Sequence, residues 1–302
     1  MTFEPGLVHT PLTPFSSDRR IDFDVYARSI EFHVRHGAEA LAVPMHCGES
    51  VSLTDAERRQ VITFAVEHAA RVPVIAHVSD AGTAIAAGLA KHAQAAGAAA
   101  IVATTPYYWT PPPAMVLEHF SQIGAAVDIP FFVLNAPGHM AGSKINTDLA
   151  LKLIDRLPNF AGVVDASLDW QFMIALLTDA ARVRPDFKLL SGTELMVSAA
   201  AIGASGLFSA LAAIAPKLVR KLFDLCRQQR LFEARAPQEE IAALRQFVKP
   251  GGVAALKTAV RIMGRDCGNP RPPLLPLDAA AEKKLAAEIE ALPSLAAEPR
   301  GW

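Results

Sequence analysis

Apolar runs of strand length alternate with segments of helical hydrophobic spacing eight times along the chain. The short runs are almost continuously apolar, as expected of strands buried on both faces of a parallel sheet. We predict strands near 7–13, 40–46, 73–78, 98–104, 130–135, 160–166, 187–191 and 203–209. We predict helices near 24–36, 54–70, 83–96, 114–127, 147–157, 169–183 and 194–202, with an eighth from about 215. Eight such units indicate a (β/α)8 TIM barrel, whereas five or six would favour an open doubly wound sheet.

The last quarter of the chain continues the helical spacing but has no further strand. It is alanine-rich and is interrupted by Pro237 and by turn-forming segments at 250–252 and 268–273. We therefore predict a barrel over residues 1–225 and a C-terminal helical region over 226–302 that packs on it. We expect the segment 296–302 to be loose.

Composition and charge narrow the class of partner. The chain has 302 residues, 51% of them hydrophobic, and a formal net charge of -1. That length supports one large core, and the balanced charge argues against nucleic acid or an acidic membrane as a partner. No glycine-rich dinucleotide or phosphate-binding motif follows a predicted strand, so we expect no cofactor. The sequence favours a protein that binds a small molecule.

The cysteines and the apolar runs indicate the compartment. Cys47, Cys226 and Cys267 are widely spaced and form no CxxC pair, which argues against disulfides or a zinc knuckle. No apolar run is long enough to span a bilayer, and the first residues lack a signal-peptide pattern. We therefore expect a cytoplasmic protein.

Several segments at the ends of predicted strands resemble one known family. These segments are 44–50, 105–108, 131–137, 159–167, 191–194 and 202–209. In this order they resemble motifs of the dihydrodipicolinate synthase and N-acetylneuraminate lyase family, the DapA family. The resemblance implies a TIM barrel, a homo-oligomer (tetramer or dimer), and aldolase-type lyase chemistry on a 2-oxo acid. In that family a lysine of the sixth strand, within Gly-Ile-Lys-Glu-Ala-Ser, forms a Schiff base with the substrate.

The residues that carry the family chemistry are different in this chain. The lysine position is occupied by Val164, and the tyrosine expected on the fifth strand is replaced by Leu134. Lys144, Lys152 and Lys188 do not follow a strand's carboxyl end in the predicted layout, so none can replace the missing amine there. We therefore do not expect the Schiff-base mechanism.

The loops after the strands keep the family frame but change its polar groups. The segment at 44–50 resembles Gly-Thr-Thr-Gly-Glu, which holds the substrate carboxylate, but His46 and Cys47 replace the threonines. Tyr108 matches the tyrosine that serves as a proton relay in the neighbouring subunit's site. His139 lies where the family commonly has an arginine for a substrate carboxylate, and an imidazole cannot reproduce that bidentate fork.

The sequence thus predicts a lyase that acts on a small oxo-acid-like metabolite, a carboxylate, without a lysine imine. Tyr108 is the candidate catalytic proton relay. The candidate substrate-binding residues are His46, Cys47, Gly48, Asn135, His139, Asp165, Gly192 and Ser209.

Two alternatives remain open. The protein is either an enzyme of this kind or a pseudoenzyme that binds a metabolite without turnover. A third hypothesis is a metal-dependent aldolase or hydratase, because imidazole and carboxylate groups are metal ligands. Its ligands would come from His46, His77, His139 and Asp165.

Overall fold

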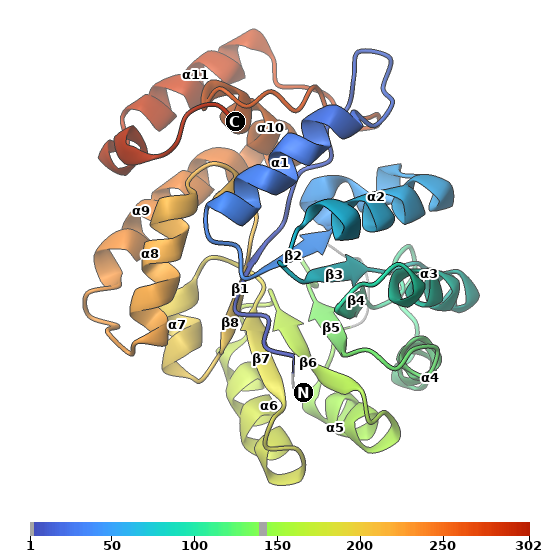
Figure 1. The fold of residues 1–302 in the computed structure, drawn as a ribbon. Coiled ribbons are helices and arrows are strands. Elements are labelled where there is room, and N and C mark those ends of the chain that lie inside the picture. Colours follow the sequence, from blue (N-terminus) through green and yellow to red (C-terminus); the bar gives the residue numbers. More distant parts are fainter. Residues whose placement is uncertain (1–2, 139–143) are drawn as a thin grey trace.

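The computed structural model describes residues 3–138 and 144–302 and shows a closed barrel of eight parallel strands in chain order (Figure 1). The predicted (β/α)8 barrel is confirmed. The strands are β1 (Leu7–His9), β2 (Ala40–Val43), β3 (Val74–His77), β4 (Ala100–Thr104), β5 (Phe131–Asn135), β6 (Phe160–Asp165), β7 (Lys188–Ser191) and β8 (Gly206–Ser209).

A ring of helices surrounds the strands, and further helices follow the barrel. The ring consists of α1 (Phe23–Arg35), α2 (Asp55–His68), α3 (Thr83–Ala95), α4 (Pro113–Gly124), α5 (Thr147–Arg156), α6 (Trp170–Val183), α7 (Met196–Ala201) and α8 (Pro216–Arg227). The chain then forms α9 (Arg235–Val248), α10 (Gly252–Ile262) and α11 (Ala279–Glu290). Short 3-10 helices include η1 (His46–Gly48) after β2, η4 (Lys249–Gly251) between α9 and α10, and η5 (Pro293–Ala297) after α11. None of the helices in the described ranges is long and apolar enough to cross a membrane.

Local sequence signals set the helix ends. Thr54 accepts a hydrogen bond from the backbone N–H of Glu57, and the Glu57 carboxylate accepts one from the backbone N–H of Thr54. This capping box satisfies two N–H groups that a helix start leaves without partners. It fixes where α2 begins and therefore the length of the loop between β2 and α2.

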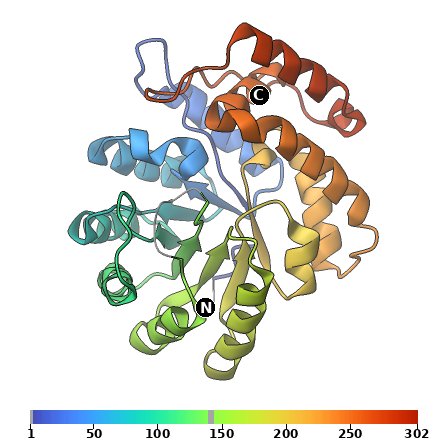
Figure 2. The same cartoon turned by 180° about the vertical axis from the view of Figure 1, so that it is seen from behind.

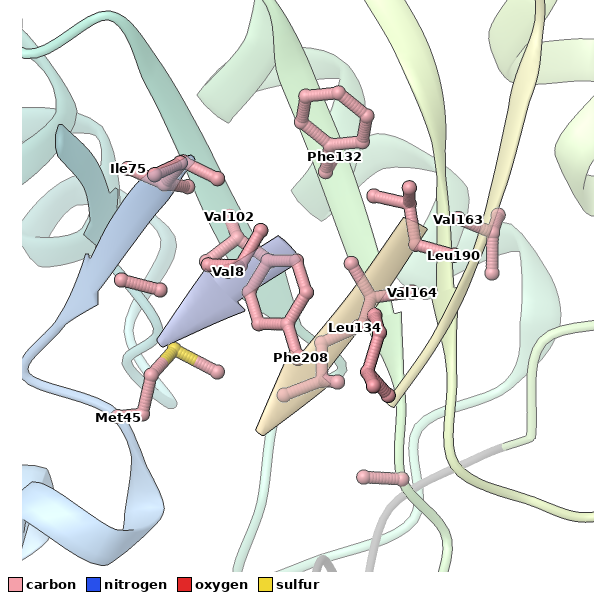
Figure 3. Packing of buried hydrophobic residues seen from close by; sticks show 14 of the residues in the cluster. Val8, Met45, Ile75, Val102, Phe132, Leu134, Val163, Val164, Leu190 and Phe208 are labelled. Atoms are coloured by element: carbon pink, nitrogen blue, oxygen red, sulfur yellow. The ribbon is translucent and has the colours of Figure 1, made fainter. Parts of the chain in front are cut away.

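Apolar side chains fill the barrel interior (Figure 3). Residues of neighbouring strands that share a register position meet there: Leu134 of β5 pairs with Val164 of β6, which pairs with Leu190 of β7. All three are buried. Since side chains alternate along a strand, residues one position further along face the surrounding helices instead.

The helices after the barrel pack on one of its sides. Figures 1 and 2 show α9, α10 and α11 outside the ring, beside α8 and α1. α9 contacts α7 and α8, and α10 contacts η1 in the loop after β2. The sequence-based division at residue 225 falls inside α8. The C-terminal helices thus reach the carboxyl ends of the strands.

The expectation of a loose end at 296–302 is wrong. The Glu298 carboxylate accepts hydrogen bonds from the backbone N–H groups of Lys217 and Leu218 at the start of α8. The guanidinium of Arg265, which is completely buried, donates to the carbonyl oxygens of Pro299 and Gly301. Composition could not reveal these contacts, because they join residues far apart in the sequence.

Candidate active site

A cavity of about 200 Å³ lies at the carboxyl ends of the strands. This is the end of a (β/α)8 barrel where active sites are found. The barrel contributes Thr10, Met45, His46, Cys47, Leu134, Ala136, Val164, Ala166, Gly192, Thr193, Glu194, Phe208, Ala210 and Leu211. The C-terminal helices contribute Arg245, Val248, Lys249, Gly252, Val253 and Leu256. The cavity is therefore shared by the barrel and the region that follows it.

The floor of the cavity is apolar. Val164 and Leu134, which the sequence resemblance assigns to the family lysine and tyrosine positions, are register partners on adjacent strands and both line the cavity. Figure 3 shows them beside Phe208 in the barrel interior. No lysine of the described residues lines this floor.

The thiol of Cys47 is held inside the protein. Its Sγ lies 3.2 Å from the hydroxyl oxygen of Thr10 and 3.3 Å from the carbonyl oxygen of Thr10. Burial raises the pKa of the Cys47 thiol to about 11. Cys47 is therefore a protonated hydrogen-bond donor at neutral pH and not a nucleophilic thiolate.

The Glu194 carboxylate lies in the cavity wall, and hydrogen-bond donors of the protein occupy both of its oxygens. Its Oε1 accepts hydrogen bonds from the Ser209 hydroxyl at 2.9 Å and from the backbone N–H groups of Ala210 and Leu211 at 3.0 and 3.1 Å. Its Oε2 accepts one from Arg245 of α9 at 3.0 Å. The arrangement joins β7, β8 and α9, and it leaves the carboxylate little capacity for a further partner.

Basic groups lie at the mouth. Arg245 and Lys249 are four residues apart at the end of α9, so they lie on the same helical face. Lys249 is exposed and forms no ion pair within the described residues. His46 is also exposed and lines the cavity from the opposite loop.

The predicted binding residues divide into two groups. His46, Cys47 and Gly192 line the cavity, and Gly192 has no space for a Cβ, which would lie 2.9 Å from Cβ of Ala166. The described residues that do not line the cavity are Gly48, Asn135, Asp165 and Ser209. His139 lies outside the described residues.

Strand alternation explains why Asn135 and Asp165 do not reach the cavity. Each directly follows a cavity-lining residue, Leu134 or Val164, and therefore faces the other way. Asn135 Nδ2 donates to Asp165 Oδ2 at 2.6 Å, and the Ser167 hydroxyl donates to the same carboxylate. Burial raises the pKa of Asp165. This pair joins the ends of β5 and β6.

The described residues give no support to the metal alternative. His77 is buried outside the cavity, with its Nε2 2.7 Å from the Ser79 hydroxyl oxygen. No group of three or more His, Cys, Asp or Glu side chains that could hold a metal occurs within residues 3–138 and 144–302. The proposed ligand His139 lies outside these ranges.

The loop after β2 is held by ion pairs with the C-terminal region. Glu49 Oε1 lies 2.7 Å from Lys257 Nζ, and both side chains are buried. Arg271 donates two hydrogen bonds to the Glu57 carboxylate at 2.8 and 2.6 Å, and this contact lowers the pKa of Glu57 to about 2. Thr13 adds a hydrogen bond to the Gly48 carbonyl oxygen. The loop frame expected from the sequence is thus fixed by the C-terminal region.

Tyr108 does not line the cavity of this chain. It is 95% exposed and has a positive φ of 85°. Its relay role in a neighbouring subunit stays a prediction.

Sequence reasoning missed five polar cavity residues: Thr10, Thr193, Glu194, Arg245 and Lys249. Glu194 follows a predicted strand in the Ser-Gly-Thr-Glu segment, so its position was a usable signal. The two basic residues had none, because charges on an amphipathic helix usually face solvent.

The whole chain matches one family. Residues 4–292 match the model of the Dihydrodipicolinate synthetase family. The chain belongs to this family. The 4-hydroxy-tetrahydrodipicolinate synthase of Methanococcoides burtonii is 32% identical over 286 residues, 93% of this chain and 96% of that protein. An uncharacterized DapA-like lyase of Halobacterium salinarum is 32% identical over 288 residues, 94% and 92% of the two chains.

Solved structures of the dihydrodipicolinate synthetase family agree with the fold. A putative dihydrodipicolinate synthetase from Pseudomonas aeruginosa is 28% identical with a TM-score of 0.89, over 97% of this chain and 100% of that one. The similarity extends over both the barrel and the C-terminal helices. The membership inferred from motifs is therefore confirmed.

Proposed function

We propose that this member of the family is an aldolase-type lyase that cleaves or forms a carbon–carbon or carbon–oxygen bond in a small oxo-acid-like carboxylate without a lysine imine. The observation that carries the proposal is the floor of the cavity. The chain matches its family over residues 4–292 and has a cavity at the expected end of the barrel, and Val164, which the sequence resemblance assigns to the lysine position, lines that cavity.

The remaining polar groups suggest how such chemistry proceeds. A lyase of this kind needs a group that moves a proton and a positive charge near the developing enolate. His46 supplies an exposed imidazole at the cavity, and Arg245 and Lys249 supply positive charge. We assign the proton transfer to His46 and the electrostatic stabilisation to the two basic side chains.

Borohydride trapping tests the absence of the imine. Intact protein incubated with pyruvate and borohydride should show no added three-carbon unit by mass spectrometry, because no amine lies at the floor. The informative control is Lys249→Met, since Lys249 is the lysine among the described cavity residues. An adduct that disappears in this variant would show that Lys249 forms an imine and would contradict the proposal.

Turnover tests the lyase assignment. Pyruvate release from 4-hydroxy-2-oxo acids should be measurable in a coupled assay and should fall about a hundredfold or more in His46→Gln, as expected for loss of a proton-transfer group. The apolar floor favours the second candidate, a binding protein without turnover. A metabolite that co-purifies in stoichiometric amount and is never converted would establish that alternative.

We also propose that the protein is a homo-oligomer in which Tyr108 is covered by a partner subunit. A tyrosine that is 95% exposed at a positive φ supports this. Light scattering coupled to size-exclusion chromatography should show a multimer of the 32.2 kDa chain that dissociates more readily in Tyr108→Ala. A monomer at all concentrations would reject the assignment.

A further inference from the structure

The loop that holds the substrate carboxylate in the resemblance uses several of its donors internally. The Cys47 thiol is directed at the oxygens of Thr10. The backbone N–H groups of Gly48 and Glu49 donate within the loop, to the carbonyl oxygens of Met45 and His46. A carboxylate that bound to these three donors would have to displace bonds that the loop already makes.

The floor cannot hold a charge either. Val164, Leu134 and Phe208 present hydrocarbon where the lysine and tyrosine would stand. An ionised carboxylate without a hydrogen-bond donor at such a position costs several kcal/mol of desolvation. An apolar group at the floor, by contrast, gains from leaving water.

The mouth of the cavity, unlike its floor, is lined by charged side chains. Its charged lining residues are Glu194, Arg245 and Lys249, which sum to one positive charge. The Glu194 oxygens are occupied by donors from the protein, including Arg245. The positive charge of Lys249 is therefore available to an anion that enters the cavity.

We propose that the cavity takes a monocarboxylate with an apolar tail, the tail on the floor at Val164 and Leu134 and the carboxylate at the mouth near Lys249. This orientation is the reverse of the one that the family resemblance implies. It rests on the proposed function in one respect: if the ligand is the substrate of a lyase, the substrate is a 2-oxo acid with an aliphatic or aromatic tail.

The cavity size limits the tail. A sealed apolar cavity of about 150 Å³ holds one benzene molecule, and the volume here is about 200 Å³. A tail of about six carbon atoms fits by that comparison. A single excess positive charge at the mouth favours one carboxylate over two.

Calorimetric titration with pyruvate, 2-oxobutanoate, 2-oxopentanoate and 2-oxohexanoate tests the orientation. Each added methylene should tighten binding about fourfold, because burial of one CH2 contributes about 0.8 kcal/mol. Val164→Thr has nearly the same volume and places a hydroxyl at the floor, so it should flatten this dependence on chain length. Equal affinity for all four acids would overturn the proposal.

Lys249→Met tests the carboxylate end. It should weaken 2-oxohexanoate binding about fivefold, the upper range for a solvent-exposed ion pair. Binding of hexan-2-one, which has a similar tail but no charge, should not change. Lys91→Met is the matched control, because Lys91 is exposed on α3 and does not line the cavity. Unchanged 2-oxohexanoate affinity in Lys249→Met would overturn the proposal.

The two proposals fail in different ways. Affinity that rises with chain length and depends on Lys249, with no turnover of 4-hydroxy-2-oxo acids of any length, supports the orientation and rejects the lyase. Turnover of short 4-hydroxy-2-oxo acids, with no gain in affinity from a longer tail, rejects the orientation and leaves the lyase intact.

Discussion

The two sides of the barrel's carboxyl end differ in their polar side chains. On the side of β5 and β6, the floor residues that the sequence resemblance assigns to the family's catalytic positions are Leu134 and Val164. On the side of β2, Glu49 and Glu57 are kept and are paired with Lys257 and Arg271 of the C-terminal region. The polar groups that hold the loop after β2 are therefore present. The floor beside β5 and β6, in contrast, has no polar group at Leu134 and Val164 that could contact a substrate.

Among the substitutions that test this difference, replacement of Lys257 should cause the largest loss of stability. Lys257→Met leaves Glu49 buried without its cation, which should lower the free energy of unfolding by about 3–5 kcal/mol. Urea unfolding measures the loss. The control is Lys152→Met, which breaks an exposed ion pair with Asp148 and should change stability by less than about 1 kcal/mol. Equal losses in both variants would show that the buried pair does not hold the loop.

The reverse change, polar groups restored at the floor, should be milder. Val164→Lys with Leu134→Tyr enlarges two buried side chains and should cost about 1–3 kcal/mol of stability. Desolvation should lower the pKa of the new amine, so the double variant should form a borohydride-trappable imine with pyruvate. We expect negligible turnover of aspartate semialdehyde or N-acetylneuraminate, because His46 and Cys47 do not restore the carboxylate-binding loop.

Two results with the double variant would contradict this prediction. Turnover near that of an ordinary synthase would mean that the rest of the cavity still fits the family substrate. No imine at all would mean that the amine at position 164 does not meet the substrate carbonyl.

Four buried histidines are polar groups that burial keeps uncharged. Burial lowers the pKa of His77 to about 3 and of His119 to about 4, from an ordinary value of 6.5. Burial also lowers the pKa of His9 to about 3 and lowers the pKa of His33 well below its ordinary value, and the Nδ1 atoms of the two rings lie 3.0 Å apart. The unfolded chain therefore binds more protons than the folded one between pH 6.5 and about 4.

Stability should consequently fall as the pH falls through that window. Each such histidine contributes a slope of up to about 1.4 kcal/mol per pH unit. Urea unfolding at pH 7, 6 and 5 measures the total slope of the unfolding free energy against pH. His119→Gln should reduce this slope by the contribution of one histidine, up to about 1.4 kcal/mol per pH unit. A flat profile from pH 7 to 5 would contradict the prediction.

The fold could be read from the sequence because each buried strand is an apolar run of its own. The main errors lie at strand ends. The first strand was predicted to reach residue 13 but ends at His9, where Pro11 soon removes a ladder donor. Such ends depend on backbone hydrogen bonds that hydrophobicity does not report.

The site could be read only in part. Val164, Leu134, His46 and Cys47 reach the cavity because they stand at or just past strand ends. Asp165 was grouped with them, although alternation from a lining Val164 already places its side chain on the other face. The basic mouth could not be found, because it comes from a helix beyond the barrel whose docking depends on tertiary contacts.

The buried guanidinium of Arg265 has a practical consequence for work on this protein. It donates to carbonyl oxygens of Ala213 in the barrel and of Pro299 near the end of the chain. A truncation before Pro299, or a purification tag that pulls this segment away, would leave a buried cation short of acceptors. Tags therefore belong at the amino end, and limited proteolysis near residue 299 should report on whether this segment stays docked on Arg265.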